Sequence, residues 1–552
     1  MNPPAVAAPQ LVAPGDRGWL LHDAAASRAI EADALARHAP QLLMQRAGLG
    51  LARLALALAP HAQRVWVAAG PGNNGGDGLV AATHLHRAGR SVRVSLCADA
   101  ARMPADAAQA LADAQAAGVA ITPALPDDSA TQAFELTIDA LLGLGAGRPP
   151  QGAIAAAIAR LNAGAAPCLA ADLPSGLHPD TGRLLGAHAV RATATLALLT
   201  LKPGLFTGAG RDHAGSIWLD PLGVDVTAAP AGIRLAGVHD LRAALPPRRH
   251  ASHKGSYGDI AVVGGAAGMT GAAWLAARAA LAAGVGRVFV DLLGEPGCSG
   301  DPARPELMLR PGWWRSPVEV LARSVVVAGC GGGTAIGAAL PTLLARCPRL
   351  VLDADALNRL AAEPALFSRL QPRRARGWHT VLTPHPLEAA RLLQTDAAAV
   401  QADRIAAARR LAHQTGCVVL LKGSGTVIAD ADGGCVLNPT GSARLASGGS
   451  GDVLAGWLGG LWAQQPRDRD DDRGAAAAVG AAGADRRSGA LGAEPVHADG
   501  GQAALRATVA AAWTHGRAGE DDHDDPAPFV LRAADLIERL QAVTSRTLRT
   551  TG

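Results

Sequence analysis

The chain has few aromatic side chains and no closely spaced pair of cysteines. Only 3% of its 552 residues are Phe, Trp or Tyr, whereas 66 are glycine, so we expect aliphatic, closely packed cores. The seven cysteines never occur as Cys-x-x-Cys, which argues against a zinc site or a disulfide framework. Scattered cysteines of this kind are typical of a reducing compartment, and we therefore expect a cytoplasmic protein.

Other absences exclude whole classes of partner. A formal net charge of +4 over this length predicts no attraction to nucleic acid or to an anionic membrane. The first residues lack a basic segment followed by an apolar one, so we expect no secretory signal. The most apolar helical run, residues 49–59, is short and contains Arg53, which indicates a buried or amphipathic helix rather than a membrane span. Small molecules remain as the expected partners.

The length and the pattern of the chain predict two α/β domains. Short β-like runs alternate with longer Ala/Leu-rich helical segments, which favours parallel sheets covered by helices on both faces. The alternation weakens between residues 225 and 252, so we place the domains at 1–235 and 236–552. An Arg/Asp run followed by Ala/Gly repeats predicts a flexible insertion at 464–502. The expected strands are 65–69, 92–96, 136–139, 168–172, 259–263, 287–291, 324–328, 350–353, 380–382, 417–421 and 426–429.

The most informative stretch is a glycine-rich run at residues 446–456, which precedes an apolar segment of helical character. Glycines allow the backbone to approach an anion closely, and the N–H groups at a helix N-terminus attract phosphate. Asp452 would repel phosphate, so we expect it to accept the proton of a hydroxyl that attacks phosphorus. The run indicates a phosphoryl-transfer site; the alternative is a turn that caps a buried helix.

A second glycine cluster, residues 70–78, follows a predicted strand and leads into a helix that we expect to begin at Leu79. Two asparagines and an aspartate interrupt the spacing of a dinucleotide-binding fingerprint. Asp139 and Asp172 end two later strands, and the carboxyl ends of parallel strands meet in one crevice. The group predicts acid–base chemistry or a site for a hard cation, with ordinary turn caps as the alternative.

These residues resemble two known families. The first half is similar to the NAD(P)H-hydrate epimerase family, also called the YjeF N-terminal domain. The second half resembles the ADP-dependent NAD(P)H-hydrate dehydratases of the ribokinase-like superfamily. The resemblance covers nearly the whole chain from about residue 20, apart from 464–502. It is carried by residues 70–78, 139–143, 172–176 and 201–204 in the first half, and by 252–255, 268–272, 353–358, 383–386, 421–426 and 448–456 in the second.

The epimerase resemblance implies a Rossmann-like, three-layer αβα domain that binds hydrated NAD(P)H and K⁺. Asp172 is the implied acid–base residue for inversion at C6 of the nicotinamide ring. The implied K⁺ ligands are Asn74, Asp139 and Ser175, with backbone oxygens of the loop that runs from Gly143 to Pro149. The implied substrate-binding residues are Asn73, Asn74, Gly75, Gly76, Asp77 and Asp172.

The dehydratase resemblance implies a ribokinase-like αβα domain with ADP as co-substrate, Mg²⁺ beside it, and a homo-oligomeric state. Hydroxide is a poor leaving group, and phosphorylation of the C6 hydroxyl by ADP makes it a good one. Asp452 is the implied base, and the backbone N–H groups of Gly449, Ser450 and Gly451 suit the transferred phosphoryl group. The implied substrate-binding residues are Ala272, Gly331, His385 and Asp452, and the implied ADP/AMP-binding residues are Lys422, Gly423, Ser424, Gly425, Thr426 and Gly451.

One loop departs from the dehydratase pattern. Residues 329–333 read Gly-Cys-Gly-Gly-Gly where Gly-Pro-Gly-Leu-Gly is typical, which predicts a more mobile loop with a cysteine open to oxidation if it is exposed.

Two other functions fit the same motifs. One is a ribokinase-like vitamin or sugar kinase with a regulatory nucleotide-binding N-terminal domain. The other is a non-catalytic module that senses nucleotides or a partner protein.

Overall fold

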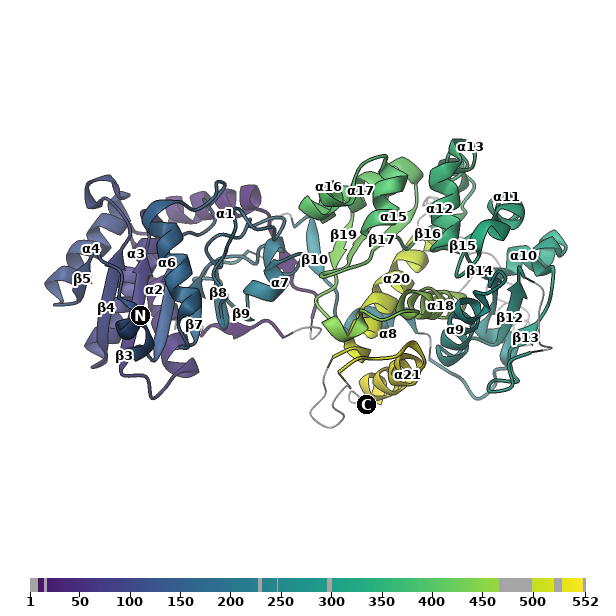
Figure 1. Cartoon of the computed structure of the whole chain (residues 1–552), viewed down its shortest axis with the longest axis horizontal. Helices are drawn as coiled ribbons and strands as arrows, with labels where there is room; N and C mark the ends of the chain where they lie inside the picture. The colour runs from purple at the N-terminus through teal and green to yellow at the C-terminus, as the bar shows by residue number, and fades with distance from the viewer. Residues whose placement is uncertain are drawn as a thin grey trace, which may run out of the picture. The chain divides into compact units, whose positions relative to one another are not determined.

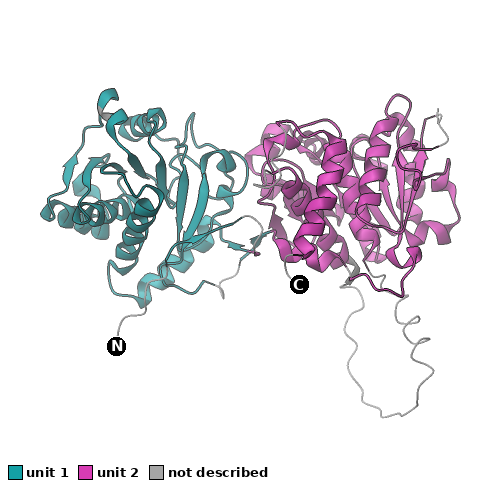
Figure 2. Ribbon diagram, turned by 90° about the horizontal axis from the view of Figure 1, so that it is seen from below, with its two compact units in different colours: residues 1–14, 19–235 teal, residues 15–18, 236–552 magenta. Residues whose placement is uncertain are grey.

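The chain forms two compact units of α/β architecture (Figure 1). The computed structural model describes residues 8–13, 17–226, 231–245, 247–294, 300–465, 499–520 and 529–549. Unit 1 comprises residues 1–14 and 19–235, and unit 2 comprises residues 15–18 and 236–552 (Figure 2). Within the described ranges, no helix combines the length and the apolar character needed to cross a membrane.

Unit 1 is built on a sheet whose strands run in the order β1-β9-β8-β7-β6-β3-β4-β5. Neighbouring strands are parallel except for β1 and β9, which are antiparallel. A short antiparallel pair, β2 (Leu20–Leu21) with β10 (Ile233–Leu235), also falls in its residues. The sheet strands are β1 (Gln10–Leu11), β3 (Arg64–Ala69), β4 (Ser91–Leu96), β5 (Ala120–Thr122), β6 (Leu136–Ala140), β7 (Cys168–Ala171), β8 (Ala194–Leu198) and β9 (Ser216–Asp220).

Alternate side chains of β3 point to opposite faces of the sheet, and each face packs against its own layer of helices. Val65 and Val67 face a core shared with α2 and α3, whereas Trp66 and Ala68 face a second core shared with α6. Strand β3 is buried on both faces, as expected of a central parallel strand. The helices are α1 (Ala24–Arg37), α2 (Leu42–Leu58), α3 (Asn73–Arg87), α4 (Ala105–Ala116), α5 (Asp128–Ala133), α6 (Gly152–Ala163) and α7 (Gly210–His213).

Unit 2 contains a sheet in the order β13-β12-β11-β14-β15-β16-β17-β18-β19. The strands from β13 to β17 are parallel, and β17, β18 and β19 continue the sheet as antiparallel neighbours. The strands are β11 (Asp259–Gly264), β12 (Arg287–Leu292), β13 (Met308–Leu309), β14 (Ser324–Ala328), β15 (Arg349–Leu352), β16 (His379–Leu382), β17 (Val418–Leu421), β18 (Val427–Ala429) and β19 (Cys435–Leu437).

Helices of unit 2 pack very closely where small residues meet. A Cβ on Gly456 of α18 would lie 1.9 Å from the carbonyl oxygen of Ala276 on α9, so only glycine allows these two backbones to touch. This contact fixes the N-terminus of α18 beside the sheet. The helices are α8 (Val238–Ala244), α9 (Thr270–Ala282), α10 (Val318–Arg323), α11 (Ile336–Arg346), α12 (Asp355–Ala362), α13 (Pro364–Phe367), α14 (Gln371–Ala375), α15 (Pro386–Leu393), α16 (Ala397–Ala402), α17 (Arg404–Thr415), α18 (Ser450–Ala463), α20 (Asp499–Ala518) and α21 (Ala533–Arg549).

In each unit, successive strands are first added toward one edge of the sheet and later toward the other edge. The order of the strands therefore reverses at one point. In unit 1 the reversal lies between β3 and β6, and in unit 2 it lies between β11 and β14. Ligands of open α/β sheets bind outside the carboxyl ends of the strands at such a switch point. The loops after β3, β6, β11 and β14 are therefore where a site is expected.

The α/β class with helices over the sheets is confirmed, and each predicted strand is present with its ends shifted by no more than one residue. The prediction of parallel sheets holds for most strand pairs. It is wrong at one edge of each sheet, where neighbouring strands are antiparallel. Helix α3 begins at Asn73 rather than at Leu79, since its glycines allow the first turn to pack against neighbouring backbone.

The range predicted as a flexible insertion, 464–502, includes folded residues at both of its ends. Gln464 and Gln465 are buried, and their side-chain amides donate to backbone carbonyl groups, among them that of Ala283. At the other end, α20 already begins at Asp499. Both ends of the assigned range therefore belong to the fold of unit 2, and residues 466–498 lie outside the described part of the chain.

Candidate active sites

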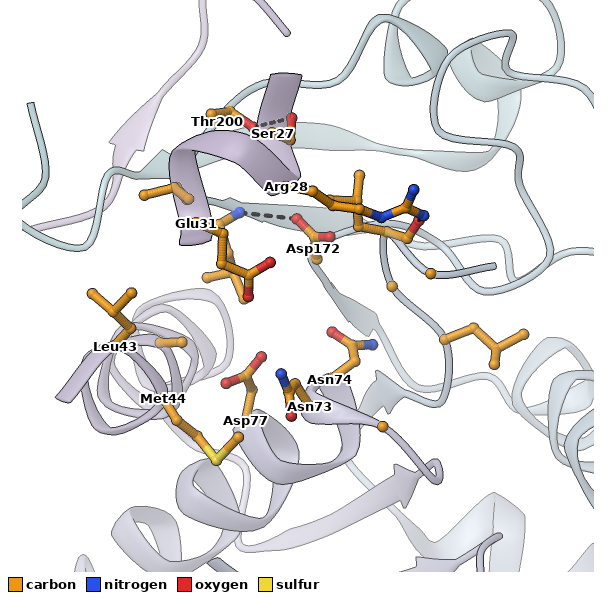
Figure 3. Close-up of a pocket in the computed structure, with 18 of the residues that line it drawn as sticks. Ser27, Arg28, Glu31, Leu43, Met44, Asn73, Asn74, Asp77, Asp172 and Thr200 are labelled. Atoms are coloured by element: carbon orange, nitrogen blue, oxygen red, sulfur yellow. Dashed lines mark hydrogen bonds between the residues drawn. The ribbon is translucent and has the colours of Figure 1, made fainter. Parts of the chain in front are cut away.

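A cavity of about 500 Å³ opens at the switch point of unit 1 (Figure 3). The loop after β3 and the first turn of α3 form one side of it, the loop after β6 lines it with residues 141–146, and the turn after β7 contributes Asp172. Leu43 and Met44 of α2 supply an apolar wall. The cavity therefore joins an apolar surface to several carboxyl and amide groups, as small-molecule sites do.

Asp172 is held in the cavity by a buried ion pair with Lys202. The Lys202 ammonium group donates to Asp172 Oδ1 and to the carbonyl oxygens of Leu198 and Thr200, at 2.7 and 3.0 Å. The backbone N–H of Leu198 also donates to Asp172 Oδ1, at 3.2 Å. Asp172 has a left-handed backbone (φ 63°), a strained conformation for a non-glycine residue. Its carboxyl group is thus placed by backbone and side chain together.

Glu31, Asp77 and Asp106 share the cavity with Asp172. Glu31 enters from α1 and Asp77 from the first turn of α3 (Figure 3). Burial, followed by repulsion from Asp172, raises the pKa of the Glu31 carboxyl. Burial, with repulsion from Asp172 and Glu31, raises the pKa of Asp77 well above its usual range. When carboxyl groups interact in this way, one of them tends to carry a proton while a neighbour is ionised.

Of the predicted cation ligands, Asp139 and Ser175 contact each other, and Asn74 lines the cavity beside the loop after β6, to which Ser175 is hydrogen-bonded. Ser175 donates from Oγ (2.7 Å) and from its backbone N–H (2.8 Å) to the fully buried carboxylate of Asp139, whose pKa burial raises to about 6. The side-chain amide of Asn74 is buried and receives no hydrogen bond from the described residues. A Cβ on Gly143 would lie 3.3 Å from Asn74, so the 143–149 loop begins against it. A buried carboxylate beside an unpartnered amide oxygen fits a monovalent cation.

The loop expected to supply backbone oxygens, from Gly143 to Pro149, meets the cavity only over its first part. Residues 143–146 line the cavity, whereas residues 147–149 do not. Pro149 is exposed, and a Cβ on Gly186 would lie 3.5 Å from the Cβ of Pro149, so the end of the loop runs toward another turn of unit 1. Of the predicted range, residues 143–146 thus meet the cavity, and the chain leaves it before Pro149.

The other predicted substrate residues of unit 1 divide into two kinds. Asn73, Asn74 and Asp77 line the cavity. Gly75 and Gly76 are buried, and a Cβ there would lie 2.0 Å from the Gly70 carbonyl oxygen or 2.6 Å from Met44. These two glycines therefore allow the first turn of α3 to pack, and Gly72 at its N-cap leaves the N-terminal amides without a side-chain cap.

At the switch point of unit 2, three groups from different elements converge. Ligand atoms of Cys330 (after β14), Asp353 (after β15) and Asp452 (first turn of α18) all lie within 4.8 Å of one another. Burial, followed by repulsion from Asp353, raises the pKa of Asp452 to about 6. Asp452 is thus a carboxyl group poised to exchange a proton near neutral pH.

Cys330 itself is buried, so the exposure on which its expected oxidation depended is not met. Burial, with repulsion from Asp452 and Asp353, raises the pKa of the thiol well above its usual range, so the group stays protonated. A protonated thiol is a poor metal ligand, and Asp353 already pairs with Lys422. The cluster therefore does not suit Mg²⁺, which prefers a full set of oxygen ligands.

Lys422 lies beside these carboxyl groups. Its Nζ donates to Asp353 Oδ1 at 2.7 Å and lies 4.0 Å from Glu388 Oε2, while Thr383 Oγ1 donates to the same Asp353 oxygen at 2.8 Å. Burial lowers the pKa of the Lys422 ammonium, but attraction by Asp353 and Glu388 outweighs it and raises the pKa overall. Lys422 thus remains charged at the base of the predicted nucleotide loop, and a Cβ on Gly451 would lie 3.4 Å from its Nζ.

The loop after β17 holds the predicted ADP/AMP residues. Thr426 Oγ1 donates to the Gly423 carbonyl oxygen at 3.1 Å, and Gly423 and Gly425 have positive φ angles that favour glycine. Below this loop the buried Arg404 donates to the carbonyl oxygens of Leu421 and Lys422, at 3.2 and 3.1 Å. Ser424 and Gly425 lie in the same loop, where Gly423 and Ser424 are exposed and Gly425 is buried.

The remaining predicted substrate residues of unit 2 lie near the switch point. A Cβ on Gly331, whose φ is 57°, would lie 2.9 Å from the Cβ of Ala272, so the two predicted residues are neighbours. His385 caps α15, because its Nδ1 accepts the backbone N–H groups of Leu387 (3.1 Å) and Glu388 (3.4 Å). Burial, then Lys422, lowers the pKa of His385, so the ring is neutral when it caps the helix.

Comparison with known proteins decides the family. A model described as NAD(P)H-hydrate dehydratase matches residues 260–542, and one described as YjeF-related protein N-terminus matches residues 40–204. The chain is 36% identical over 428 residues to the bifunctional NAD(P)H-hydrate repair enzyme Nnr of Escherichia coli (strain K12), covering 77% of this chain and 81% of that enzyme. It is 37% identical over 432 residues to the Coxiella burnetii enzyme of the same name, covering 77% and 86%.

The chain belongs to the bifunctional NAD(P)H-hydrate repair enzymes. Among solved structures, it is similar to an ADP/ATP-dependent NAD(P)H-hydrate dehydratase from Bacillus subtilis, co-crystallized with ATP/Mg²⁺. That similarity has a TM-score of 0.42 at 26% identity and covers 56% of this chain and 97% of that one.

Several residues of this repair-enzyme chain escaped the sequence interpretation. Lys202 and Asp353 stand within quoted motifs, but only the fold shows that they pair with Asp172 and Lys422. Glu31 lies outside every motif. His515, on α20, is half-buried, and its Nε2 contacts the Ser450 carbonyl oxygen at 3.0 Å. Desolvation lowers its pKa to about 4, so the neutral ring donates this hydrogen bond.

Proposed function

We propose that this chain repairs hydrated NADH and NADPH in two steps. Unit 1 interconverts the R and S epimers at C6 of the hydrated nicotinamide ring, and unit 2 dehydrates the S epimer with conversion of ADP to AMP and phosphate. The observation that carries this proposal is the presence of a separate acid–base centre at the switch point of each unit: Asp172 with Lys202, and Asp452 with Cys330 and Asp353.

In unit 2, the Asp452 carboxylate accepts the proton of the C6 hydroxyl, whose oxygen then attacks the β-phosphorus of ADP and displaces AMP. Phosphate departs from C6 with its bonding electrons as a proton leaves C5, which restores the C5–C6 double bond. Helix α18 begins at Ser450 without a side-chain cap, and its N-cap Gly449 has φ 86°. The backbone N–H groups of Gly449, Ser450 and Gly451 are proposed to bind the transferred phosphoryl group, for which Ser450 would give up its long hydrogen bond to the Ser447 carbonyl oxygen at 3.4 Å.

Lys422 and the 422–426 loop are proposed to hold the ADP phosphates. The ammonium group already neutralises Asp353, and Gly423 and Ser424 of the loop are exposed. Ala272, Gly331 and His385 are proposed to contact the hydrated nicotinamide, because Ala272 and Gly331 are neighbours at the switch point and His385 follows β16 beside Lys422. The Cys330–Asp353–Asp452 cluster does not suit Mg²⁺.

In unit 1, Asp172 is proposed to move the protons that inversion at C6 requires. Asn73, Asn74, Gly75, Gly76 and Asp77 form the first turn of α3, whose uncapped amides suit a phosphate group of the dinucleotide. Asn74, Asp139 and Ser175, with backbone oxygens from the cavity-lining part of the 143–149 loop, would hold K⁺. The ion would supply a fixed positive charge beside the substrate.

The setting of these reactions is also proposed. The scattered cysteines, of which those described are unpaired, support a cytoplasmic location. We expect NAD(P)H hydrates and ADP as small-molecule partners, no nucleic acid or membrane partner, and a homo-oligomer.

The test supplies each purified epimer with ADP and follows the absorbance of the reduced nicotinamide. We expect wild-type enzyme to convert both epimers. Asp452→Asn should leave the S epimer unconverted while it still equilibrates the two epimers. Phosphorylation of a vitamin or sugar, with neither hydrate consumed, would instead support the kinase alternative.

A further inference from the structure

We propose that Glu31 is a second proton-transferring residue of the unit 1 cavity and works together with the Asp172–Lys202 pair. This inference rests on the proposed epimerase function. Glu31 lies on α1 (Ala24–Arg37), before residue 40, where the YjeF-related match begins. No motif considered above assigns it a role.

The position of Glu31 fits this role. Its side chain reaches into the cavity from α1, and in the view of Figure 3 its carboxyl group lies between those of Asp172 and Asp77. It is partly exposed, so it can exchange protons with solvent between turnovers. No hydrogen bond or ion pair from the described residues reaches its carboxylate, and a structural role would need such a contact.

The neighbouring cation cannot be the proton donor. Lys202 Nζ directs its three hydrogen bonds to Asp172, Leu198 and Thr200, which accounts for all three ammonium protons. Of the hydrogen bonds to Asp172 from described residues, each ends at Oδ1, so Oδ2 is the oxygen left for substrate. Inversion needs one group that donates a proton and one that accepts it, and the ion pair supplies the acceptor alone.

The charges around Glu31 support a carboxyl group that carries a proton. Burial and Asp172 raise its pKa, and Lys202 and Arg28 lower it, with an upward shift as the result. Asp77 of α3 and Asp106 of α4 also line the cavity and add negative charge. A carboxyl group in this field keeps its proton to a higher pH than an exposed glutamate does.

The proposed step moves one proton from Glu31 to Asp172. Glu31 protonates the C6 hydroxyl, the C6–O bond breaks with its electron pair leaving on water, and the lone pair of N1 forms an N1=C6 double bond. Water then adds to the opposite face of C6, the double-bond pair returns to N1, and Asp172 accepts the proton of that water. The reverse epimerisation exchanges the two roles.

The test compares Glu31→Gln with Asp33→Asn in the full-length enzyme. Asp33 lies on the same helix, is exposed, pairs with Arg37 and does not line the cavity, so it is a matched control. We expect Glu31→Gln to lower kcat for epimerisation by about 100-fold or more, with KM changed by less than about threefold. Asp33→Asn should match wild type, and both variants should dehydrate the S epimer normally.

The pH profile separates proton transfer from a structural effect. Wild-type kcat/KM should be bell-shaped, because one carboxyl group must be protonated and the other ionised, and Glu31→Gln should lose one limb. Glu31→Asp, which keeps a carboxyl group, should retain more activity than Glu31→Gln. Equal loss in both Glu31 variants, a loss confined to KM, or near-wild-type kcat in Glu31→Gln overturns the proposal. Wild-type enzyme that leaves both epimers unequilibrated would instead refute the epimerase function itself.

Discussion

The ligand atoms of Cys330 and Asp452 lie within 4.8 Å of each other. The two residues come from the loop after β14 and from the first turn of α18, which α9 holds in place through the close contact at Gly456. Burial and repulsion from Asp353 raise the pKa of Asp452, and interaction with the Cys330 thiol opposes them. Cys330 thus helps to keep the proposed base ionised at neutral pH.

Replacing Cys330 with alanine should therefore shift the pH dependence of dehydration. The base must be ionised, so activity falls as pH drops through the Asp452 pKa of about 6. Loss of the donor raises that pKa, and we expect the acid limb to move upward by a few tenths of a pH unit to about one unit. Profiles of kcat/KM against pH for Cys330→Ala and Cys330→Ser would test this, since serine keeps a donor. An unmoved limb in Cys330→Ala would contradict it.

Variants of the ion pair between Lys422 and Asp353 should affect protein stability and dehydratase activity differently. Lys422→Met leaves the buried carboxylate of Asp353 without its cation, which we expect to cost about 3 kcal/mol of unfolding free energy. Lys422→Met/Asp353→Asn should recover most of that stability but not the dehydratase activity, because the proposed phosphate contact is still absent. Urea unfolding and S-epimer turnover would be measured for both variants. Full activity in the double variant would show that Lys422 acts on structure alone.

The cation site should affect one reaction only. Replacing K⁺ with choline, which is too large for the pocket at Asn74, should slow epimerisation and leave dehydration of the S epimer unchanged. Ser175→Ala should weaken the dependence on K⁺, because it removes one oxygen ligand. Titration of each activity with K⁺ at constant ionic strength is the measurement, and an equal K⁺ response in both reactions would argue against a site in unit 1.

The sequence was most informative where periodicity and glycine spacing decide structure. Central strands such as β3 read as continuous apolar runs, and Asp139, Asp172 and Asp452 were found because each follows a strand or begins a helix. The two-residue strands β1, β2 and β13 were missed, since two residues give no period and form only against a neighbouring strand. The longer strands β5, β8, β9, β10 and β19 were missed as well.

What the sequence could not provide were partners set by tertiary contact. Lys202 lies 30 residues from Asp172, and Lys422 lies 69 from Asp353, so no local spacing joins either pair. Glu31 looks like one of many polar residues on an exposed helix until α1 is seen beside the cavity. For His385 the sequence was a better guide. An isolated histidine most often has a structural role, and His385 caps helix α15.

The central claim, that two independent centres act in sequence, is tested most directly by complementation between inactive variants. A mixture of R and S hydrates with ADP is given to Asp172→Asn, to Asp452→Asn, and to equal amounts of both, and recovery of reduced nicotinamide is followed. Asp172→Asn should convert the S portion and then slow to the uncatalysed rate of epimerisation, Asp452→Asn should convert none, and the two together should convert the whole mixture. Complete, rapid conversion by Asp172→Asn alone, or failure of the combined variants to exceed the S portion, would contradict the account.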